Sequence, residues 1–179
     1  QHQRLGDAGM TATRNLWLIF AFALVVRLAY TLGLYIGMGA EALLTEDSVL
    51  YLGLGRDFVA EGDFVRFIDS ARGFEPETER MPLYVIWLSL HQLVSGISAP
   101  LFPALTQGAL DAVACVIIAR TAMLLEPRLL LPAGLIAACN PTQFIVSAMI
   151  LTDSLFFFFV CLMLYAAVRW LRDPAWRWA

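Results

Sequence analysis

Charged residues are scarce in this chain, and lysine is absent. Charged residues make up 15% of the 179 residues, hydrophobic residues make up 60%, and all 12 basic residues are arginines. Soluble domains contain about 45–50% apolar residues by a similar count. With a mean hydropathy of +0.71, the composition excludes an ordinary soluble domain. It predicts an all-α, polytopic membrane protein with about four or five spans.

Short motifs of common enzyme classes are also missing. The sequence has no phosphate-binding glycine loop, CxxC pair, HExxH or GxSxG. The three cysteines, Cys115, Cys139 and Cys161, each lie in an apolar segment, which predicts packing residues rather than disulfides or metal ligands. The arginines are scattered and the longest polar segment is acidic, so we expect no nucleic-acid partner.

Five apolar stretches and one long polar segment remain. The polar segment, 39–80, holds ten acids and four arginines, a net charge of 4 − 10 = −6. The apolar stretches cover 16–38, 82–97, 101–125, 129–150 and 155–170. The stretch 82–97 is shorter than the roughly 20 residues that a spanning helix needs, and it carries His91 and Gln92 near its middle. We therefore expect it to lie at the outer membrane interface or dip into it.

The distribution of arginine favours four spans over five. If 82–97 does not cross, 1–15 is cytoplasmic and 39–100 is an outer loop with interfacial helices. The spans are then 16–38, 101–125, 129–150 and 155–170, and the positive-inside rule is satisfied at Arg120, Arg128, Arg169 and Arg172. If 82–97 crosses, Arg169 and Arg172 fall outside. The chain begins at Gln1, and we expect it to be the N-terminal membrane module, 1–179, of a longer protein of the plasma (inner) membrane.

The outer loop contains one clear helix pattern. Thr45 is a typical N-cap before the acids Glu46 and Asp47, and Gly62 marks the end of the helix. An apolar stripe at four-residue spacing is expected to rest on the membrane surface: Leu50, Leu54 and Phe58. The stretch 70–79, which contains glycine and proline, is expected to be a loop.

Asp47 is the first candidate for chemistry. A carboxylate at the bilayer surface can take a proton from a hydroxyl as that oxygen bonds to carbon, or it can bind a cation with Glu46 beside it. The alternative is an acid that only stabilises the start of its helix. Asp153 allows the same two interpretations, but four phenylalanines follow it at 156–159. An ionisable group at membrane depth is a functional hypothesis by default.

Two arginines are further candidates. Arg27 lies near the middle of the first span, and Asp111 lies at a comparable depth in a later one. We expect a structural Arg27–Asp111 ion pair, and contact of Arg27 with a leaving phosphate is the alternative. Arg80 follows Glu79 on the outer side, where it could hold a phosphate bidentately or snorkel beside a helix that starts at Pro82.

Taken in order, these residues resemble one family. The resemblance rests on Arg27, Asp47-x-x-x-Tyr51, Gly62-Asp63-Phe64, Arg80-Met81-Pro82-Leu83-Tyr84, Gln107, and Ala137-x-x-Asn140-Pro141 leading to Leu151-Thr152-Asp153. The chain resembles the N-terminal part of a GT-C glycosyltransferase of the dolichyl-phosphate-mannose protein mannosyltransferase type, a group that includes the aminoarabinose transferases of lipid A. The similarity covers most of residues 14–172.

The resemblance implies a glycosyltransferase whose active site faces the extracytoplasmic side. Such an enzyme moves a sugar from a polyprenyl-phosphate carrier to a protein, lipid or glycan acceptor, and we expect inversion at the sugar. The catalytic residues expected from it are Asp47 and Asp153, which could also hold a divalent cation. The expected substrate-binding residues are Glu46, Tyr51, Glu79, Arg80 and Arg27. At position 153 the family more often has glutamate.

Two other functions stay open. A transporter or flippase segment would use Arg27, Asp111 and Asp153 as an intramembrane polar path and would not need Asp47. A non-catalytic membrane partner would need none of these acids.

Overall fold

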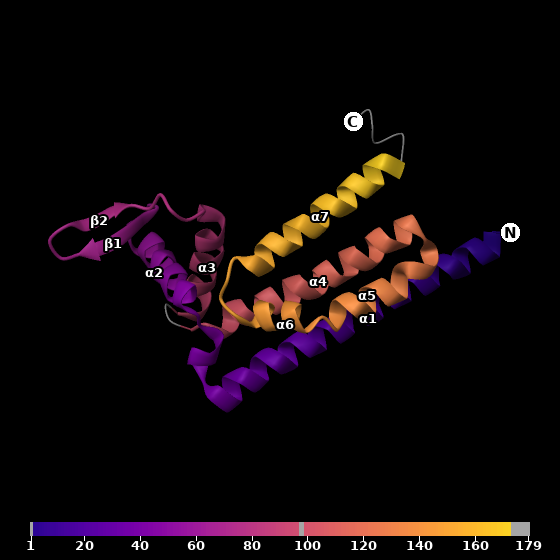
Figure 1. Ribbon diagram of the computed structural model, residues 1–179, viewed down its shortest axis with the longest axis horizontal. Helices are drawn as coiled ribbons and strands as arrows, with labels where there is room; N and C mark the ends of the chain where they lie inside the picture. The colour runs from indigo at the N-terminus through magenta and orange to yellow at the C-terminus, as the bar shows by residue number, and fades with distance from the viewer. Residues whose placement is uncertain (1, 97–98, 173–179) are drawn as a thin grey trace.

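The computed structural model describes residues 2–96 and 99–172, which form a bundle of long helices with a smaller unit across one end (Figure 1). Along the bundle run α1 (His2–Met38), α4 (Leu101–Leu125), α5 (Leu130–Ala138), α6 (Pro141–Ala148) and α7 (Asp153–Arg172). Across its end lie α2 (Glu46–Glu61) and α3 (Pro82–Ser95), and the hairpin of β1 (Val65–Asp69) and β2 (Gly73–Pro76) extends beyond them. The 3-10 turns η1 (Ala40–Leu43) and η2 (Pro127–Leu129) complete the described elements.

Three of the described helices are long and apolar enough to cross a membrane. They are Met10–Met38, Leu101–Leu125 and Asp153–Arg172, and a fourth crossing results if Pro127–Ala138 and Pro141–Ala148, bent by 52°, form one span. The prediction of a mainly α-helical fold is thus confirmed, and the lengths and composition of these helices fit the predicted membrane protein. The layout of four spans with an outer loop stays a prediction.

The bend between α5 and α6 has a local cause. Pro141 has no N–H to continue the helical ladder, and the side chain of Asn140 accepts a hydrogen bond of 3.1 Å from the N–H of Thr142. Asn140 therefore caps α6, directly after Cys139, the C-cap of α5. The result is a break in the middle of the bundle.

Small residues let α1, α4 and α5 approach one another closely. Ile19 and Ala23 of α1 pack with Cys115 of α4 and Ala138 of α5, all at most 1% exposed. A side chain at Gly134 would lie 2.5 Å from the Cδ1 atom of Ile19, so only glycine fits this crossing. Helix bundles in membranes are typically built from such small-residue contacts.

The apolar stripe of α2 lies in a different place from the predicted one. Leu54 is 2% exposed, and the stripe packs on Tyr84, Val85 and Leu88 of α3 instead of resting on a membrane surface. Pairing two amphipathic helices buries both stripes, which is more favourable than leaving one at an interface. The exposed apolar residues of α3 lie on its opposite face: Leu83, Ile86, Leu90, Leu93 and Val94.

The expected loop at 70–79 is in part a β-strand. β1 pairs antiparallel with β2, and Phe67 faces Phe74 with ring centroids 5.4 Å apart. Gly73 adopts φ 71° at the start of β2, which an L-residue with a side chain rarely adopts. The prediction was wrong because cross-strand aromatic pairing stabilises two strands too short to show a clear alternating pattern.

Candidate functional site

Asp47 and Arg80 meet where α2 begins and α3 is about to begin. Arg80 Nη2 donates a hydrogen bond of 3.1 Å to Asp47 Oδ1, and the two side chains are 32% and 55% exposed. The guanidinium also lies over the ring of Tyr51, 5.5 Å from its centroid. A carboxylate, a cation and an aromatic ring thus meet at one open position.

The caps of α2 fix the direction in which Asp47 points. The Thr45 side chain accepts from the N–H of Ser48, and Ser48 Oγ accepts from the N–H of Thr45, which is a complete capping box. The helix ends at Gly62 in the left-handed conformation, as predicted. Asp47 therefore lies in the first turn, where the helix dipole favours its charge.

Glu77 is a buried acid that fixes the backbone of Arg80 by a hydrogen bond. Its side chain is 1% exposed, and Oε1 accepts the N–H groups of Glu79 at 2.6 Å and Arg80 at 3.2 Å. Its Oε2 lies 3.7 Å from Nε of Arg66 on β1. Glu77 was not predicted as a site residue. The signal that could have indicated it is an acid placed two residues before Glu79 and three before Arg80, where it can accept both N–H groups just ahead of the helix that begins at Pro82.

A second set of bonds ties α2 to the segment that leads into α7. Ser48 Oγ donates to the Ile150 carbonyl at 2.8 Å, and the Ile150 N–H donates to the Leu43 carbonyl at 3.1 Å. Gln107 Nε2 donates to the Met149 carbonyl at 2.8 Å. The start of α7 is therefore held at the same end of the bundle as Asp47. Ser48 was also missed, since its role depends on a partner 102 residues away.

Tyr84 connects these two sets of bonds. Its hydroxyl donates to Gln107 Oε1 at 2.7 Å, and its ring meets that of Tyr51 edge to face at 5.1 Å. Burial raises the pKa of Tyr84, and the negative charge of Asp153 raises it further. Tyr84 therefore stays a neutral donor across the physiological pH range.

The charges around Arg80 keep it a cation. Desolvation lowers the pKa of Arg80, but Tyr51, Asp47 and Glu79 outweigh this effect, so the pKa is raised above its ordinary value. The Nε–H of Arg80 is buried and has no partner among the described residues. The side chain of Arg80 as a whole is 32% exposed and lines a cavity, so its outer guanidinium nitrogens can meet an anion there.

A cavity of about 330 Å³ opens beside this cluster. Its polar rim comes from Tyr51, Glu79 and Arg80, and the other wall comes from the start of α7. The remaining lining residues are Met81, Leu83, Tyr84, Thr152, Leu155, Phe156 and Phe159. The cavity is thus charged on one side and apolar on the other.

The remaining predicted site residues are less closely involved. Asp153 is exposed in the first turn of α7, next to the cavity-lining Thr152. Its negative charge contributes to the raised pKa of Tyr84. Glu46 is exposed and is not among the residues that line the cavity. Within residues 2–96 and 99–172, no three His, Cys, Asp or Glu side chains come together as metal ligands. A cation at Asp47 would need further ligands from substrate or water.

Arg27 lies away from this cavity, deep in the bundle. It forms the predicted ion pair with Asp111, and both side chains are 0% exposed. Its Nη1 donates to the Ala138 carbonyl at 3.0 Å and its Nη2 to the Ala137 carbonyl at 3.4 Å, so Arg27 caps the broken end of α5. Gln143 Nε2 donates to the other oxygen of Asp111 at 2.6 Å.

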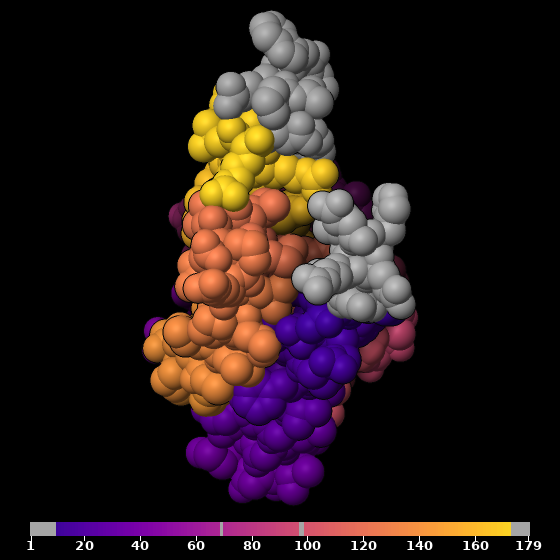
Figure 2. All heavy atoms as spheres, turned by 90° about the vertical axis from the view of Figure 1, so that its right-hand side faces the viewer, coloured from indigo at the N-terminus to yellow at the C-terminus, as the bar shows by residue number. Residues whose placement is uncertain are grey.

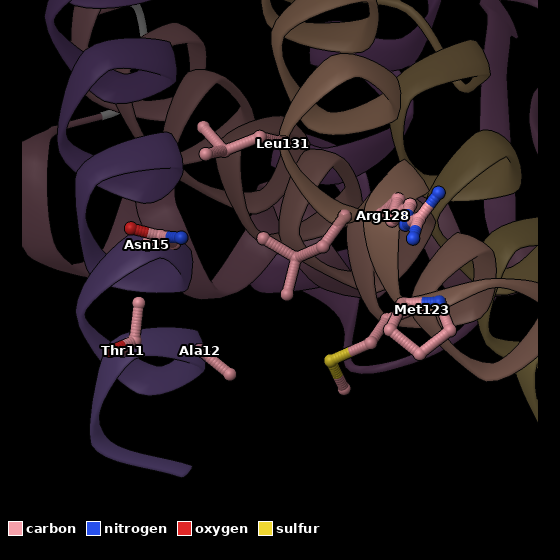
Figure 3. Close-up of a pocket in the computed structure, with 8 residues that line it drawn as sticks. Thr11, Ala12, Asn15, Met123, Arg128 and Leu131 are labelled. Atoms are coloured by element: carbon pink, nitrogen blue, oxygen red, sulfur yellow. The ribbon is translucent and has the colours of Figure 1, made fainter. Parts of the chain in front are cut away.

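A larger cavity, about 520 Å³, lies at the opposite end of the bundle (Figure 3). Thr11 and Asn15 of α1 line one side, and Arg128 lies on the other side. Figure 2 views this end, where the start of α1, the α4–α5 turn and the end of α7 gather. It lies at the end of the bundle away from Asp47 and Asp153, so its size does not make it the candidate active site.

Comparison of the chain with known protein families, curated proteins and solved structures found no match.

Proposed function

We propose that this protein is a membrane glycosyltransferase that moves a sugar from a polyprenyl phosphate to a protein, lipid or glycan acceptor. The observation that carries the proposal is the half-charged, half-apolar cavity with Arg80 at its rim and Asp47 bonded to Arg80. A polyprenyl phosphate has a compact anion and a long apolar chain. Arg80 suits the anion, and the apolar residues of α7, Leu155, Phe156 and Phe159, suit the first isoprene units.

The proposed reaction is a single displacement with inversion. The acceptor oxygen or nitrogen bonds to the anomeric carbon, the bond from that carbon to the phosphate oxygen breaks, and its electron pair leaves with the lipid phosphate. Asp47 accepts the proton of the acceptor, since its Oδ2 has no partner among the described residues. Arg80 stabilises the negative charge that develops on the departing phosphate.

Asp153 acts from the second side of the site in this proposal. It starts α7, whose first turns line the cavity, and the bonds of Ser48 and Gln107 hold the preceding segment in place. A carboxylate there can orient the acceptor or share a divalent cation with Asp47 and the donor phosphate. Asp47, Arg80, Tyr51 and Glu79 form the first side.

The proposed orientation puts the α2–α3 unit outside the cell membrane. α1, α4, the α5–α6 pair and α7 make four crossings, and α3 rests its exposed apolar face on the outer interface. Arg120, Arg128, Arg169 and Arg172 then lie on the cytoplasmic side of the inner membrane. The closed Arg27–Asp111 pair favours this enzyme over a transporter, because neither side chain is accessible to a passing solute.

A transfer assay tests the proposal. Membranes with the full gene product would receive labelled polyprenyl-phosphate sugars, and wild type would be compared with Asp47→Asn at matched protein level. We expect transfer to fall by about 10²- to 10⁴-fold, as loss of a general base usually causes. The matched control is Glu41→Gln, an exposed acid in the same segment that lines no cavity, and it should keep full activity.

Two results would contradict the proposal. Unchanged transfer in Asp47→Asn would remove Asp47 from the mechanism. Absence of transfer from every polyprenyl-phosphate donor would favour the non-catalytic partner.

A further inference from the structure

A groove between α1 and α4 lies at the end of the bundle opposite the candidate site. It has a volume of about 410 Å³, and its α1 wall is Thr13, Leu16, Trp17 and Phe20. Its α4 wall is Val113, Val116 and Arg120. The two helices run antiparallel here, so Thr13 and Arg120 lie at one end of the groove and Phe20 and Val113 at the other (Figure 1).

Arg120 has an unusual position within its helix. It is exposed, and five residues follow it up to the end of α4 at Leu125, which corresponds to about 7–8 Å along the axis. All five of these residues except Thr121 are apolar. The side chain thus starts inside the apolar part of a candidate span, where an isolated charge is unfavourable.

Arg120 forms no ion pair with the described residues. The ion pairs within residues 2–96 and 99–172 use Arg27, Arg56, Arg66 and Arg80. An arginine at the depth of the lipid headgroups needs a partner or water, and a phosphate matches its planar donors best. The missing partner is therefore an anion at the polar end of the groove.

The rest of the groove identifies that anion as part of a lipid. Below Arg120 the walls are apolar over about one helical turn, from Val116 to Val113 on α4 and from Leu16 to Phe20 on α1. Trp17 lines the groove and is 67% exposed, a placement typical of an aromatic side chain at the membrane interface. A soluble phosphate compound would use only the polar end and leave the apolar walls uncovered.

We propose that the α1–α4 groove binds one anionic phospholipid, with its phosphate on Arg120 and an acyl chain between Phe20 and Val113. The site is separate from the cavity at Asp47 and Arg80, and it does not depend on the proposed glycosyl transfer. It requires only that α1 and α4 lie in a membrane. The binding site faces the leaflet at the end where α1 begins and α4 ends.

Fluorescence of Trp17 tests this proposal directly. The four other tryptophans, Trp87, Trp170, Trp176 and Trp178, would be replaced by phenylalanine, and the protein would be reconstituted in phosphatidylcholine vesicles. Brominated phosphatidylglycerol or brominated phosphatidylcholine is then added at equal mole fraction, and each quenches tryptophan only in contact. We expect phosphatidylglycerol to be enriched at Trp17 about fivefold, the effect of about one charge contact at the membrane surface.

Two variants separate the groove from general attraction to the membrane. Arg120→Gln should bring the quenching ratio of the two lipids close to one. The matched control, Arg128→Gln, removes an exposed arginine that lies at the same end but outside the groove, and should leave the ratio unchanged. Equal loss in both variants, or no enrichment in the wild type, would overturn the proposal.

A third variant tests the apolar walls. Val116→Trp should fill the groove and abolish the enrichment while Arg120 remains; this variant is followed by retention of phosphatidylglycerol in native mass spectra. If Val116→Trp instead changes the number of chains in the particle and leaves lipid retention unchanged, the groove is a helix-docking face and the proposal is wrong. Helix content by circular dichroism confirms that each variant is folded.

Discussion

The chain contains two arginine–aspartate pairs whose surroundings differ sharply. Arg27 and Asp111 are both 0% exposed, and the other donors of Arg27 bind carbonyls of α5 and the sulfur of Cys115. Arg80 and Asp47 are 32% and 55% exposed, and Arg80 keeps an Nε–H without a partner among the described residues. The Arg27–Asp111 pair thus holds α1, α4 and α5 together, whereas the Arg80–Asp47 pair is accessible to a ligand.

The comparison shows why depth alone is a poor guide to function. An ionisable residue inside a span is a functional candidate by default, and Arg27 fits that description better than Arg80. Yet every direction around Arg27 is filled by a bonding partner from α1, α4 or α5. Exposure beside a cavity is the more informative property, and Arg80 has it.

The largest expected effect is on the buried pair. Asp111→Ala leaves the Arg27 guanidinium buried without its counter-ion, and we expect the free energy of unfolding to fall by about 3–5 kcal/mol. Titration with SDS in mild detergent, followed by circular dichroism, measures this. The double variant Arg27→Met/Asp111→Leu should recover only part of the loss, since the α5 carbonyls lose their donor. Full recovery would mean that Arg27 does not cap α5.

Arg80→Gln should show the opposite balance. The exposed pair contributes about 0–1 kcal/mol to stability, so the SDS midpoint should barely move. Transfer should fall by about 10²- to 10³-fold, the usual effect of removing a donor to a developing anion. Arg56→Gln, which removes an arginine of α2 that is 57% exposed, is the control. Comparable losses of transfer in both variants would show that Arg80 has no special role.

Glu77→Ala should affect both properties at an intermediate level. It removes the acceptor of two N–H groups, so we expect stability to fall by about 1–3 kcal/mol. Arg80 also loses its fixed direction, and transfer should fall more than stability alone explains. Glu77→Gln keeps an acceptor oxygen and should restore most of the transfer. Equal activity of the two variants at equal protein level would contradict a positioning role.

Two serines provide the smallest test. Ser48→Ala removes the α2 capping box and the bond to the Ile150 carbonyl, and we expect a loss of about 1–2 kcal/mol. Ser154 is equally buried, but its Oγ has no partner among the described residues, so Ser154→Ala should be neutral or stabilising. Thermal unfolding of both variants in detergent checks the difference. A destabilised Ser154→Ala would reveal a bond that the structure lacks.

Local signals account for the parts of the fold that the sequence predicted. Thr45 caps the start of α2 with its side chain, and Gly62 ends α2 with a left-handed backbone conformation. Pro141 interrupts its helix because it has no backbone N–H. The Arg27–Asp111 pair followed from equal depth in two apolar stretches. Each of these inferences needs only neighbouring residues or one length scale.

The contacts that assemble the candidate site depend on more distant geometry. Arg80 reaches Asp47 only because the hairpin and the α2–α3 packing bring back a segment 33 residues away. The buried position of Glu77 depends on the turn between β2 and α3, and the role of Ser48 depends on the path of the segment before α7. Sequence patterns do not encode these paths, so the sequence indicated Arg80 and Asp47 separately but not their bond.

The cap that Arg27 provides for α5 also has a consequence for the order of membrane insertion. α1 emerges from the ribosome before α4 and carries an arginine within its candidate span, and the acid partner Asp111 follows 84 residues later. The carbonyls of Ala137 and Ala138 accept hydrogen bonds from that same arginine. The early helix is therefore unfavourable in lipid until the later ones arrive, and we expect the translocon to retain α1 until α4 and α5 have been synthesised.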